Sequence, residues 1–226
     1  MMAAPATGPL VIACALGIER FALRSGDRSG AAGPLTVLRT GMGPAAAERT
    51  VLRTLRDDPA HRGAAVIATG FCAGLAPGMH PGDLVLADET RDAEGSIPCS
   101  GTEVLAGALT RLLRDRPGVG LHRGPLTGSD HVVRGAERAT LRATGAIAVD
   151  MESAATLRSA TRVPRDAADG QAGPRPVAAV RVVVDAPEHE LVRVGTLRGG
   201  ISAFRVLRAV LPAFFEWHRS LLLPWR

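Results

Sequence analysis

The feature that most constrains the fold of this chain is the alternation of short apolar runs with helix-like stretches along almost its whole length. Short, unbroken apolar runs are typical of strands buried in a sheet. They cover residues 10–16, 35–38, 64–68, 84–87, 147–149 and 177–184. The predicted helices cover residues 44–57, 102–116, 137–143, 151–162 and 201–220. This order predicts an α/β fold in which helices flank a mostly parallel sheet.

The length of the chain predicts one domain. A chain of 226 residues can bury a full core and fits one large α/β domain better than two small ones. We therefore expect a single domain over residues 1–226, with a flexible loop rich in proline and glycine at about residues 161–176. No apolar run reaches the ~20 residues of a membrane-spanning helix. The first apolar stretch lacks the basic lead-in of a signal peptide, so a cytoplasmic protein is expected.

The charge and the metal-binding residue types exclude several function classes. The net charge is +5, but all 27 basic residues are arginine, which indicates codon bias. They are scattered among 22 acidic residues without a basic run, so no nucleic-acid partner is expected. The three cysteines form no Cys-x-x-Cys pair, and the histidines have no ligand spacing. We therefore expect neither disulfides nor a metal site.

Several distinctive residues follow the predicted strands. Open sheets of this class bind ligands beyond the carboxyl ends of their strands, so these residues are expected to converge. They are Glu19, Gly41, Gly70, Asp130, Glu152 and Asp185. Taken singly, Asp185 has a plainer interpretation as a loop cap or the partner of Arg181, and Glu152 as an acid that complements a helix dipole.

A glycine-rich turn is predicted at residues 69–78, Thr-Gly-Phe-Cys-Ala-Gly-Leu-Ala-Pro-Gly, after a strand. Together with the segments 40–43, 124–130, 149–152 and 181–185, in this order, it resembles the nucleoside phosphorylase/nucleosidase superfamily. The resemblance spans about residues 9–200 and is closest to methylthioadenosine/S-adenosylhomocysteine nucleosidases and the hopanoid-associated phosphorylase branch. It implies a three-layer fold with a central mixed, mostly parallel sheet, and cleavage of the N-ribosidic bond of a purine nucleoside.

The resemblance implies roles for three acids. Asp185 matches the acid that protonates, or hydrogen-bonds at, purine N7, which lets the base leave as a neutral molecule. Glu152 matches the carboxylate that binds the ribose hydroxyls and stabilises positive charge at C1′, with Met151 against the sugar. Glu19 matches the acid that activates water in the nucleosidases, and an ordinary solvated glutamate is the alternative.

The resemblance also implies that several other residues contact substrate. They are Gly70, Phe71, Cys72, Val132, Val133 and Arg181. Phe71 departs from the small or hydroxyl residue of relatives, which leaves the nucleophile open between water and phosphate. The backbone amides of residues 70–74 could still cradle an anion. The two valines replace larger residues of a nucleosidase and suggest a roomier or more apolar base pocket.

Some residues keep two interpretations. Arg20 or Arg24, if it faces the pocket, favours phosphate as the nucleophile. His131 and His189 lie near the inferred base site, although surface histidine is the favoured interpretation for both. The apolar C-terminal segment, residues 201–225, is expected to pack on the sheet, with docking on a membrane surface as the alternative.

We therefore predict a purine nucleosidase or phosphorylase without a metal or redox cofactor, for which phosphate is a candidate co-substrate. Adenosylhopane is the best single substrate, giving adenine and ribosyl- or phosphoribosyl-hopane in hopanoid lipid biosynthesis. Methylthioadenosine, S-adenosylhomocysteine or another purine nucleoside is the second. A catalytically inactive nucleoside- or lipid-binding module is the alternative of another class. Relatives form homodimers or larger homo-oligomers, so a homo-oligomer with peripheral membrane contact as an option is expected.

Overall fold

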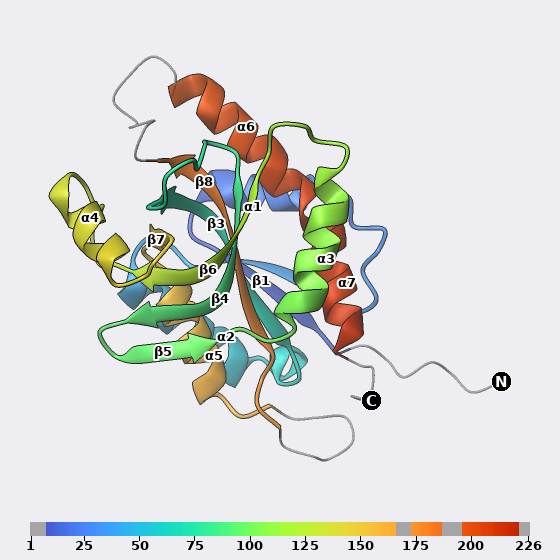
Figure 1. Cartoon of the computed structure of the whole chain (residues 1–226). Helices are drawn as coiled ribbons and strands as arrows, with labels where there is room; N and C mark the ends of the chain where they lie inside the picture. Colours follow the sequence, from blue (N-terminus) through green and yellow to red (C-terminus); the bar gives the residue numbers. More distant parts are fainter. Residues whose placement is uncertain (1–7, 166–172, 187–195, 222–226) are drawn as a thin grey trace.

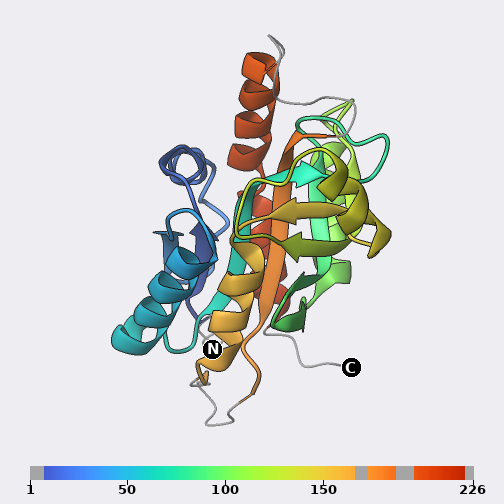
Figure 2. The ribbon, with the colours of Figure 1, turned by 90° about the vertical axis from the view of Figure 1, so that its left-hand side faces the viewer.

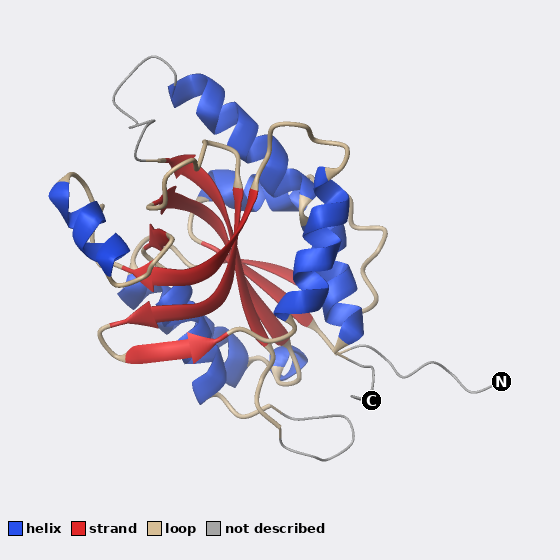
Figure 3. Ribbon diagram, in the orientation of Figure 1, coloured by secondary structure: helices blue, strands red, loops and turns tan. Residues whose placement is uncertain are grey.

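The computed structural model describes residues 8–165, 173–186 and 196–221. Eight strands form one sheet (Figures 1 and 3). The strands are β1 (Leu10–Cys14), β2 (Leu35–Arg39), β3 (Ala65–Gly74), β4 (Leu84–Asp92), β5 (Gly95–Pro98), β6 (Leu121–Gly128), β7 (Ala148–Asp150) and β8 (Val177–Asp185). The helices are α1 (Gly17–Arg24), α2 (Pro44–Asp57), α3 (Thr102–Leu113), α4 (Ala136–Ala143), α5 (Ser153–Arg162), α6 (Thr196–Ala209) and α7 (Leu211–Ser220), with a 3-10 turn at Pro59–His61.

The sheet is mixed and partly closed on itself. Its order is β2-β1-β3-β7-β6-β4-β5, and β8 pairs with both β3 and β4. The pairs β1–β2, β1–β3, β3–β8, β4–β6 and β6–β7 are parallel, whereas β3–β7, β4–β5 and β4–β8 are antiparallel. Strands β3, β8, β4, β6 and β7 therefore form a closed ring of pairings. The predicted mixed, mostly parallel sheet flanked by helices is confirmed.

Two hydrophobic clusters lie on opposite faces of the sheet. One contains apolar side chains of α1, α3, α6 and α7, and the other contains those of α2 and α5. Figure 1 shows α3, α6 and α7 on one side of the strands and α2 and α5 on the other, and the turned view in Figure 2 shows α2 beside α5. Alternate residues of β1 divide between the clusters, because successive side chains of a strand point to opposite faces: Ile12 packs in the first and Val11 in the second.

Several sequence-based boundaries are wrong. Helix α1 and strands β5 and β6 were not predicted, because they carry too few consecutive apolar residues to stand out. Residues 69–74, predicted as a turn, belong to strand β3, in which Gly70 has a φ of +131°. The predicted helix at 201–220 is two helices, α6 and α7, that meet at Val210 just before Pro212. Proline fixes φ and removes a backbone donor, so it begins the second helix.

The C-terminal helix packs against the sheet, as expected. Leu211, Phe214, Phe215 and Trp217 are at most 1 % exposed, and the Trp217 indole donates a 2.7 Å hydrogen bond to the Ser100 carbonyl. Within the described ranges no helix is long and apolar enough to cross a bilayer. The predicted loop at 161–176 lies partly outside the described residues, but its far end is anchored: the buried Arg175 donates to the carbonyl oxygens of Ala64 and Ala160.

His218 should make stability depend on pH. Burial, with Arg165 and Arg219 nearby, lowers its pKa to about 4. The unfolded chain therefore binds more protons than the folded one between about pH 6.5 and pH 4, and stability falls as the pH falls through this window. The loss attributable to His218 at pH 5 should be roughly 1–2 kcal/mol. Urea unfolding of wild type and His218→Gln at pH 7 and pH 5 measures it, and an equal loss in both proteins would contradict it.

Candidate active site

A cavity of about 240 Å³ opens at the ends of β1, β7 and β8 and beside β3. Its wall combines three acids that follow different strands, Glu19, Glu152 and Asp185, with apolar side chains. The expected convergence of these acids is therefore present. The apolar and remaining polar lining residues are Ala15, Leu16, Met42, Phe71, Cys72, Ala73, His131, Val132, Val133, Arg138, Val149, Asp150, Met151 and Val184.

Glu19 is held in place by backbone amides. It is 2 % exposed, in the first turn of α1, so it is not an ordinary solvated glutamate. Its Oε2 accepts hydrogen bonds from the amides of Ala15 (2.9 Å) and Leu16 (2.8 Å), and its Oε1 accepts one from Phe71 (2.8 Å). A carboxylate has about four acceptor sites. One site therefore remains for a ligand in the cavity, and the Phe71 amide is not available to cradle an anion.

Gly70 lets Glu19 and Arg181 approach the backbone of β3. A Cβ at this position would lie 2.5 Å from Glu19 Oε1 and 2.7 Å from Arg181 Nη1. Its φ of +131° is also a conformation that side-chain-bearing residues avoid. Gly70 itself does not line the cavity.

Arg181 pairs with Asp150, not with Asp185. The two side chains are each 1 % exposed, with Nε 2.5 Å from Oδ2, and Arg181 also donates to the Thr69 carbonyl and the Ser153 hydroxyl at 2.8 Å. The plainer interpretation of Asp185 as the partner of Arg181 is thus wrong. Arg181 is not among the cavity-lining residues, so its contacts place it behind the wall.

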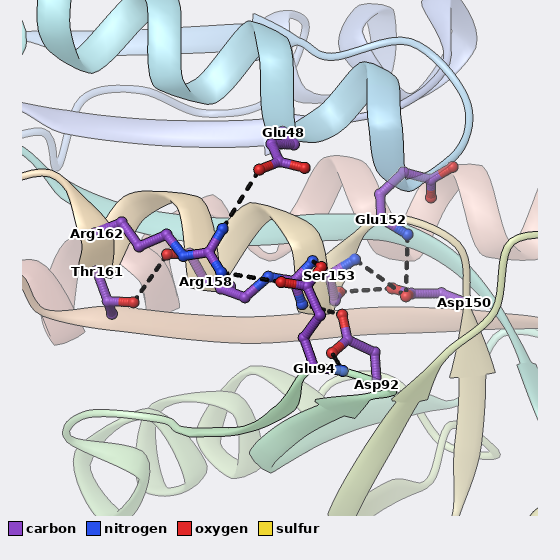
Figure 4. A network of polar contacts seen from close by, with 9 residues as sticks. All are labelled: Glu48, Asp92, Glu94, Asp150, Glu152, Ser153, Arg158, Thr161 and Arg162. Atoms are coloured by element: carbon purple, nitrogen blue, oxygen red, sulfur yellow. Dashed lines mark hydrogen bonds and ion pairs between the residues drawn. The ribbon is translucent and has the colours of Figure 1, made fainter.

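Glu152 is the N-cap residue of α5, two residues after the end of β7. The Asp150 carboxylate accepts from the amides of Glu152 (3.2 Å) and Ser153 (3.0 Å), which fixes the start of the helix. In Figure 4 the Glu152 carboxylate points away from this junction. It accepts a 2.8 Å hydrogen bond from the Gly43 amide. Burial raises the pKa of Glu152, Arg181 opposes this rise, and Asp150 and Glu19 add to it.

An ion-pair network holds α5 against neighbouring elements (Figure 4). Arg158 pairs with Asp92 and, at 2.8 Å, with Glu94 of the β4–β5 hairpin. Arg162 contacts Glu94 at 2.9 Å and Glu48 of α2 at 3.4 Å. The network joins α5 to the β4–β5 hairpin and to α2, and so supports the position of Glu152 at the start of α5.

Asp185 ends β8 and forms an ion pair with Arg138 of α4. Both residues are 8 % exposed and line the cavity. Sequence reasoning missed Arg138, because nothing in the sequence near it signals a contact with a residue 47 positions away. The place of Arg138 in a predicted helix that lies between two predicted site segments is the only local hint in the sequence.

The structure also locates the remaining predicted site residues. Met151, Phe71, Cys72, Val132 and Val133 line the cavity. Burial raises the pKa of the Cys72 thiol far above its ordinary value, with Asp150 adding to the rise, so it is no candidate for a thiolate nucleophile.

Other candidates lie outside the cavity or on its rim. Arg20 and Arg24 are exposed and do not line it, and neither do Gly41 and Asp130. The His131 side chain lines the edge of the cavity and is 57 % exposed. Hydrogen bonds to Asp130 and Glu137 raise the pKa of its ring.

His189 lies outside the described residues. Among residues 8–165, 173–186 and 196–221, no group of three His, Cys, Asp or Glu side chains could hold a metal ion.

Solved structures share this fold. The 5′-methylthioadenosine/S-adenosylhomocysteine nucleosidase of Neisseria meningitidis, in complex with methylthio-immucillin-A, matches with a TM-score of 0.69 at 19 % identity, over 90 % of this chain and 98 % of that chain. The nucleosidase of Colwellia psychrerythraea, in complex with adenine, matches with a TM-score of 0.67 at 15 % identity, over 95 % and 96 %. Futalosine hydrolase of Helicobacter pylori matches with a TM-score of 0.66 at 14 % identity, over 96 % and 99 %.

Replacing Gly70 should destabilise the protein more than replacing another glycine of positive φ. Gly70→Ala combines backbone strain with a close contact to Glu19 and should cost roughly 2–4 kcal/mol. Gly78→Ala is the matched control, since Gly78 has a φ of +73° and a Cβ placed there would meet no atom within 4 Å. Urea unfolding midpoints measure both. Equal destabilisation by the two substitutions would show that the close contact between a Cβ at position 70 and the Glu19 carboxylate does not affect stability.

Sequence comparison gives the family. No match is found among curated protein sequences. The family model of the phosphorylase superfamily matches residues 28–211, a span that contains Gly70, Glu152 and Asp185 and begins after Glu19. This match covers most of the chain and agrees with the fold of the solved structures, so the chain belongs to the phosphorylase superfamily.

Proposed function

We propose that this protein cleaves the N-ribosidic bond of a purine nucleoside, with adenine as the leaving base. The observation that carries the proposal is that Glu19, Glu152 and Asp185, from three separate strand ends, line one cavity. Cleavage of this bond places positive charge on the ribose and electron density on the base, and two carboxylates near the sugar stabilise the former. The nucleosidase of Colwellia psychrerythraea, which shares the fold, binds adenine.

The acids divide the work between the sugar and the base. Glu152, whose carboxylate is oriented by Gly43, binds the ribose hydroxyls and stabilises C1′ as the bond breaks. Glu19 keeps acceptor capacity for one further donor and orients the attacking water. Asp185 lies at the base end, where it either protonates N7 or holds a hydrogen bond at the N7 edge of the purine.

The charges of the wall favour water over phosphate as the nucleophile. The described part of the wall carries four carboxylates, those of Glu19, Asp150, Glu152 and Asp185, and its one arginine, Arg138, is paired with Asp185. Such a wall repels a phosphate dianion near the sugar, since unpaired cations or amides are needed to bind it. Hydrolysis is therefore the proposed reaction, and phosphorolysis is the alternative.

The mouth of the cavity supports an apolar 5′ substituent. Met42 and Val132 line the cavity and are 62 % and 58 % exposed. Ile18 and Phe21 of α1 are 52 % and 65 % exposed but do not line the cavity, and the Phe21 ring stacks on Phe204 of α6. Exposed apolar side chains at a cavity mouth are typical of a surface that binds an apolar group. Adenosylhopane, giving adenine and ribosylhopane, is the proposed substrate, and methylthioadenosine is the second candidate.

Neutral isosteres of the three acids should separate catalysis from folding. Asp185→Asn, Glu152→Gln and Glu19→Gln should each lower kcat/KM by about 100-fold or more, because each loses a charge or a proton-transfer group beside the reacting bond. Glu103→Gln is the control, since its carboxylate is 81 % exposed and pairs with Arg123 away from the cavity. Thermal unfolding checks that each variant is folded. Near-normal turnover of a folded variant would remove that acid from the mechanism.

A substrate comparison tests the identity of the 5′ group. Purified protein is incubated with adenosylhopane in micelles and with methylthioadenosine, each with and without phosphate, and adenine release is followed by chromatography. We expect release from adenosylhopane at a rate that phosphate does not change. Met42→Ser should raise KM for adenosylhopane more than for methylthioadenosine, because Met42 lines the cavity and is 62 % exposed.

Each other outcome of this comparison has a distinct meaning. Release from methylthioadenosine alone rejects the lipid substrate, and a requirement for phosphate establishes phosphorolysis. Tight binding of adenosine without any product supports the inactive nucleoside- or lipid-binding module. Size-exclusion chromatography with light scattering, and flotation with vesicles, test the expected homo-oligomer and the peripheral membrane contact.

A further inference from the structure

The base end of the cavity holds a donor and an acceptor without partners. The Asp185 carboxylate accepts from Arg138 through Oδ2, while its Oδ1 is buried and bonds nothing in the described part of the chain. The Arg138 guanidinium uses Nη2 for Asp185 and Nε for a long contact to the Val133 carbonyl, 3.4 Å away. Its Nη1 is also buried without a partner among the described residues.

Buried polar atoms without partners carry a large desolvation cost, so a ligand that satisfies them gains affinity. Arginine is a permanent cation and can only donate, whereas an ionised carboxylate can only accept. Arg138 and Asp185 both line the cavity, but their two unpaired atoms are themselves buried and are reached only when the side chains turn toward a ligand. A ligand that draws both atoms out presents one acceptor and one donor.

Adenine has such an edge. Its N7 accepts a hydrogen bond and its neighbouring 6-amino group donates one. We propose that Arg138 contacts the base directly, with Nη1 donating to N7 while Asp185 Oδ1 accepts from the 6-amino group. This inference rests on the proposed function and assigns the N7 contact to a residue that the resemblance does not implicate.

Other assignments leave an atom unsatisfied. If Asp185 is protonated and donates to N7, Arg138 Nη1 faces the amino group, and two donors meet. A 6-oxopurine presents two acceptors on this edge, so the Asp185 oxygen meets an acceptor. The arrangement therefore selects a 6-aminopurine over a 6-oxopurine.

The contact also favours bond cleavage. When the C1′–N9 bond breaks, its electron pair passes into the purine ring, and N7 becomes a stronger acceptor. The hydrogen bond from Arg138 strengthens with it, so the transition state is stabilised more than the bound substrate. The guanidinium keeps its proton throughout, so the base leaves as the adenine anion, and the proton that the attacking water releases as the C1′–O bond forms neutralises it.

The test compares adenine with 7-deazaadenine, in which a carbon replaces N7. Calorimetry gives the dissociation constant of each base for the wild type and for Arg138→Met. The wild type should bind adenine about 10- to 100-fold more tightly, the worth of one charge-assisted hydrogen bond. In Arg138→Met the ratio should fall to about 1. Hypoxanthine should bind the wild type more weakly than adenine.

Two further variants serve as a control and as a substitute for Arg138→Met. Arg123→Met removes an arginine that pairs with Asp88 and Glu103 outside this cavity, and it should keep the wild-type ratio. If Arg138→Met does not fold, Arg138→Lys retains the positive charge beside Asp185, and its shorter side chain should still lower the ratio at least threefold.

The outcomes separate this inference from the proposed function. The inference is overturned if the folded Arg138 variant keeps the wild-type preference for adenine over 7-deazaadenine. It is also overturned if the wild type binds the two bases equally. In either case, adenine release in the activity assay leaves the proposed function intact. A wild-type protein that binds neither base and releases none overturns both.

Discussion

The buried pair of Arg181 and Asp150 is the interaction on which the site depends. The guanidinium joins three elements: it lies on β8, bonds the Thr69 carbonyl of β3, and contacts Asp150 and Ser153 at the β7–α5 junction. Breaking a pair of this kind is costly, because the remaining charge stays buried without compensation. The pair therefore fixes where β8 ends and where α5 begins, and with them the positions of Asp185 and Glu152.

The charges of the site are ordered along the cavity. Glu19, Glu152 and Arg138 all line the cavity. In the proposed reaction the two glutamates face the sugar, which becomes positive, and Arg138 faces the base, where electron density accumulates. Arg181 lies behind the cavity wall and affects Glu152 through its charge. It opposes the rise that burial causes in the pKa of Glu152 and so favours the charged carboxylate. Fixed charges of this arrangement need no reorganisation as the bond breaks.

The sequence predicts this site unevenly, for physical reasons. Glu19, Glu152 and Asp185 follow apolar strands, and a strand end is a local signal that places a residue at the ligand edge of a sheet. Arg138 and the Arg181–Asp150 pairing carry no such signal, since their partners are chosen by packing of elements far apart in the chain. Strands β5 and β6 were missed for a similar reason, because their pairing with β4 and not their own composition specifies them.

Phe71 places a bulky side chain where the resemblance to nucleosidases implies a small or hydroxyl residue. The hydrogen bond that this position gives the site comes from its backbone amide, which donates to Glu19 at 2.8 Å, while the phenyl ring packs against the core cluster of α1, α6 and α7. Backbone amides of Ala15, Leu16 and Gly43 hold the carboxylates in the same way. Because main-chain amides orient the carboxylates, the geometry of the site depends on the backbone conformation. At Gly70 the backbone lies so close to Glu19 and Arg181 that there is no room for a side chain.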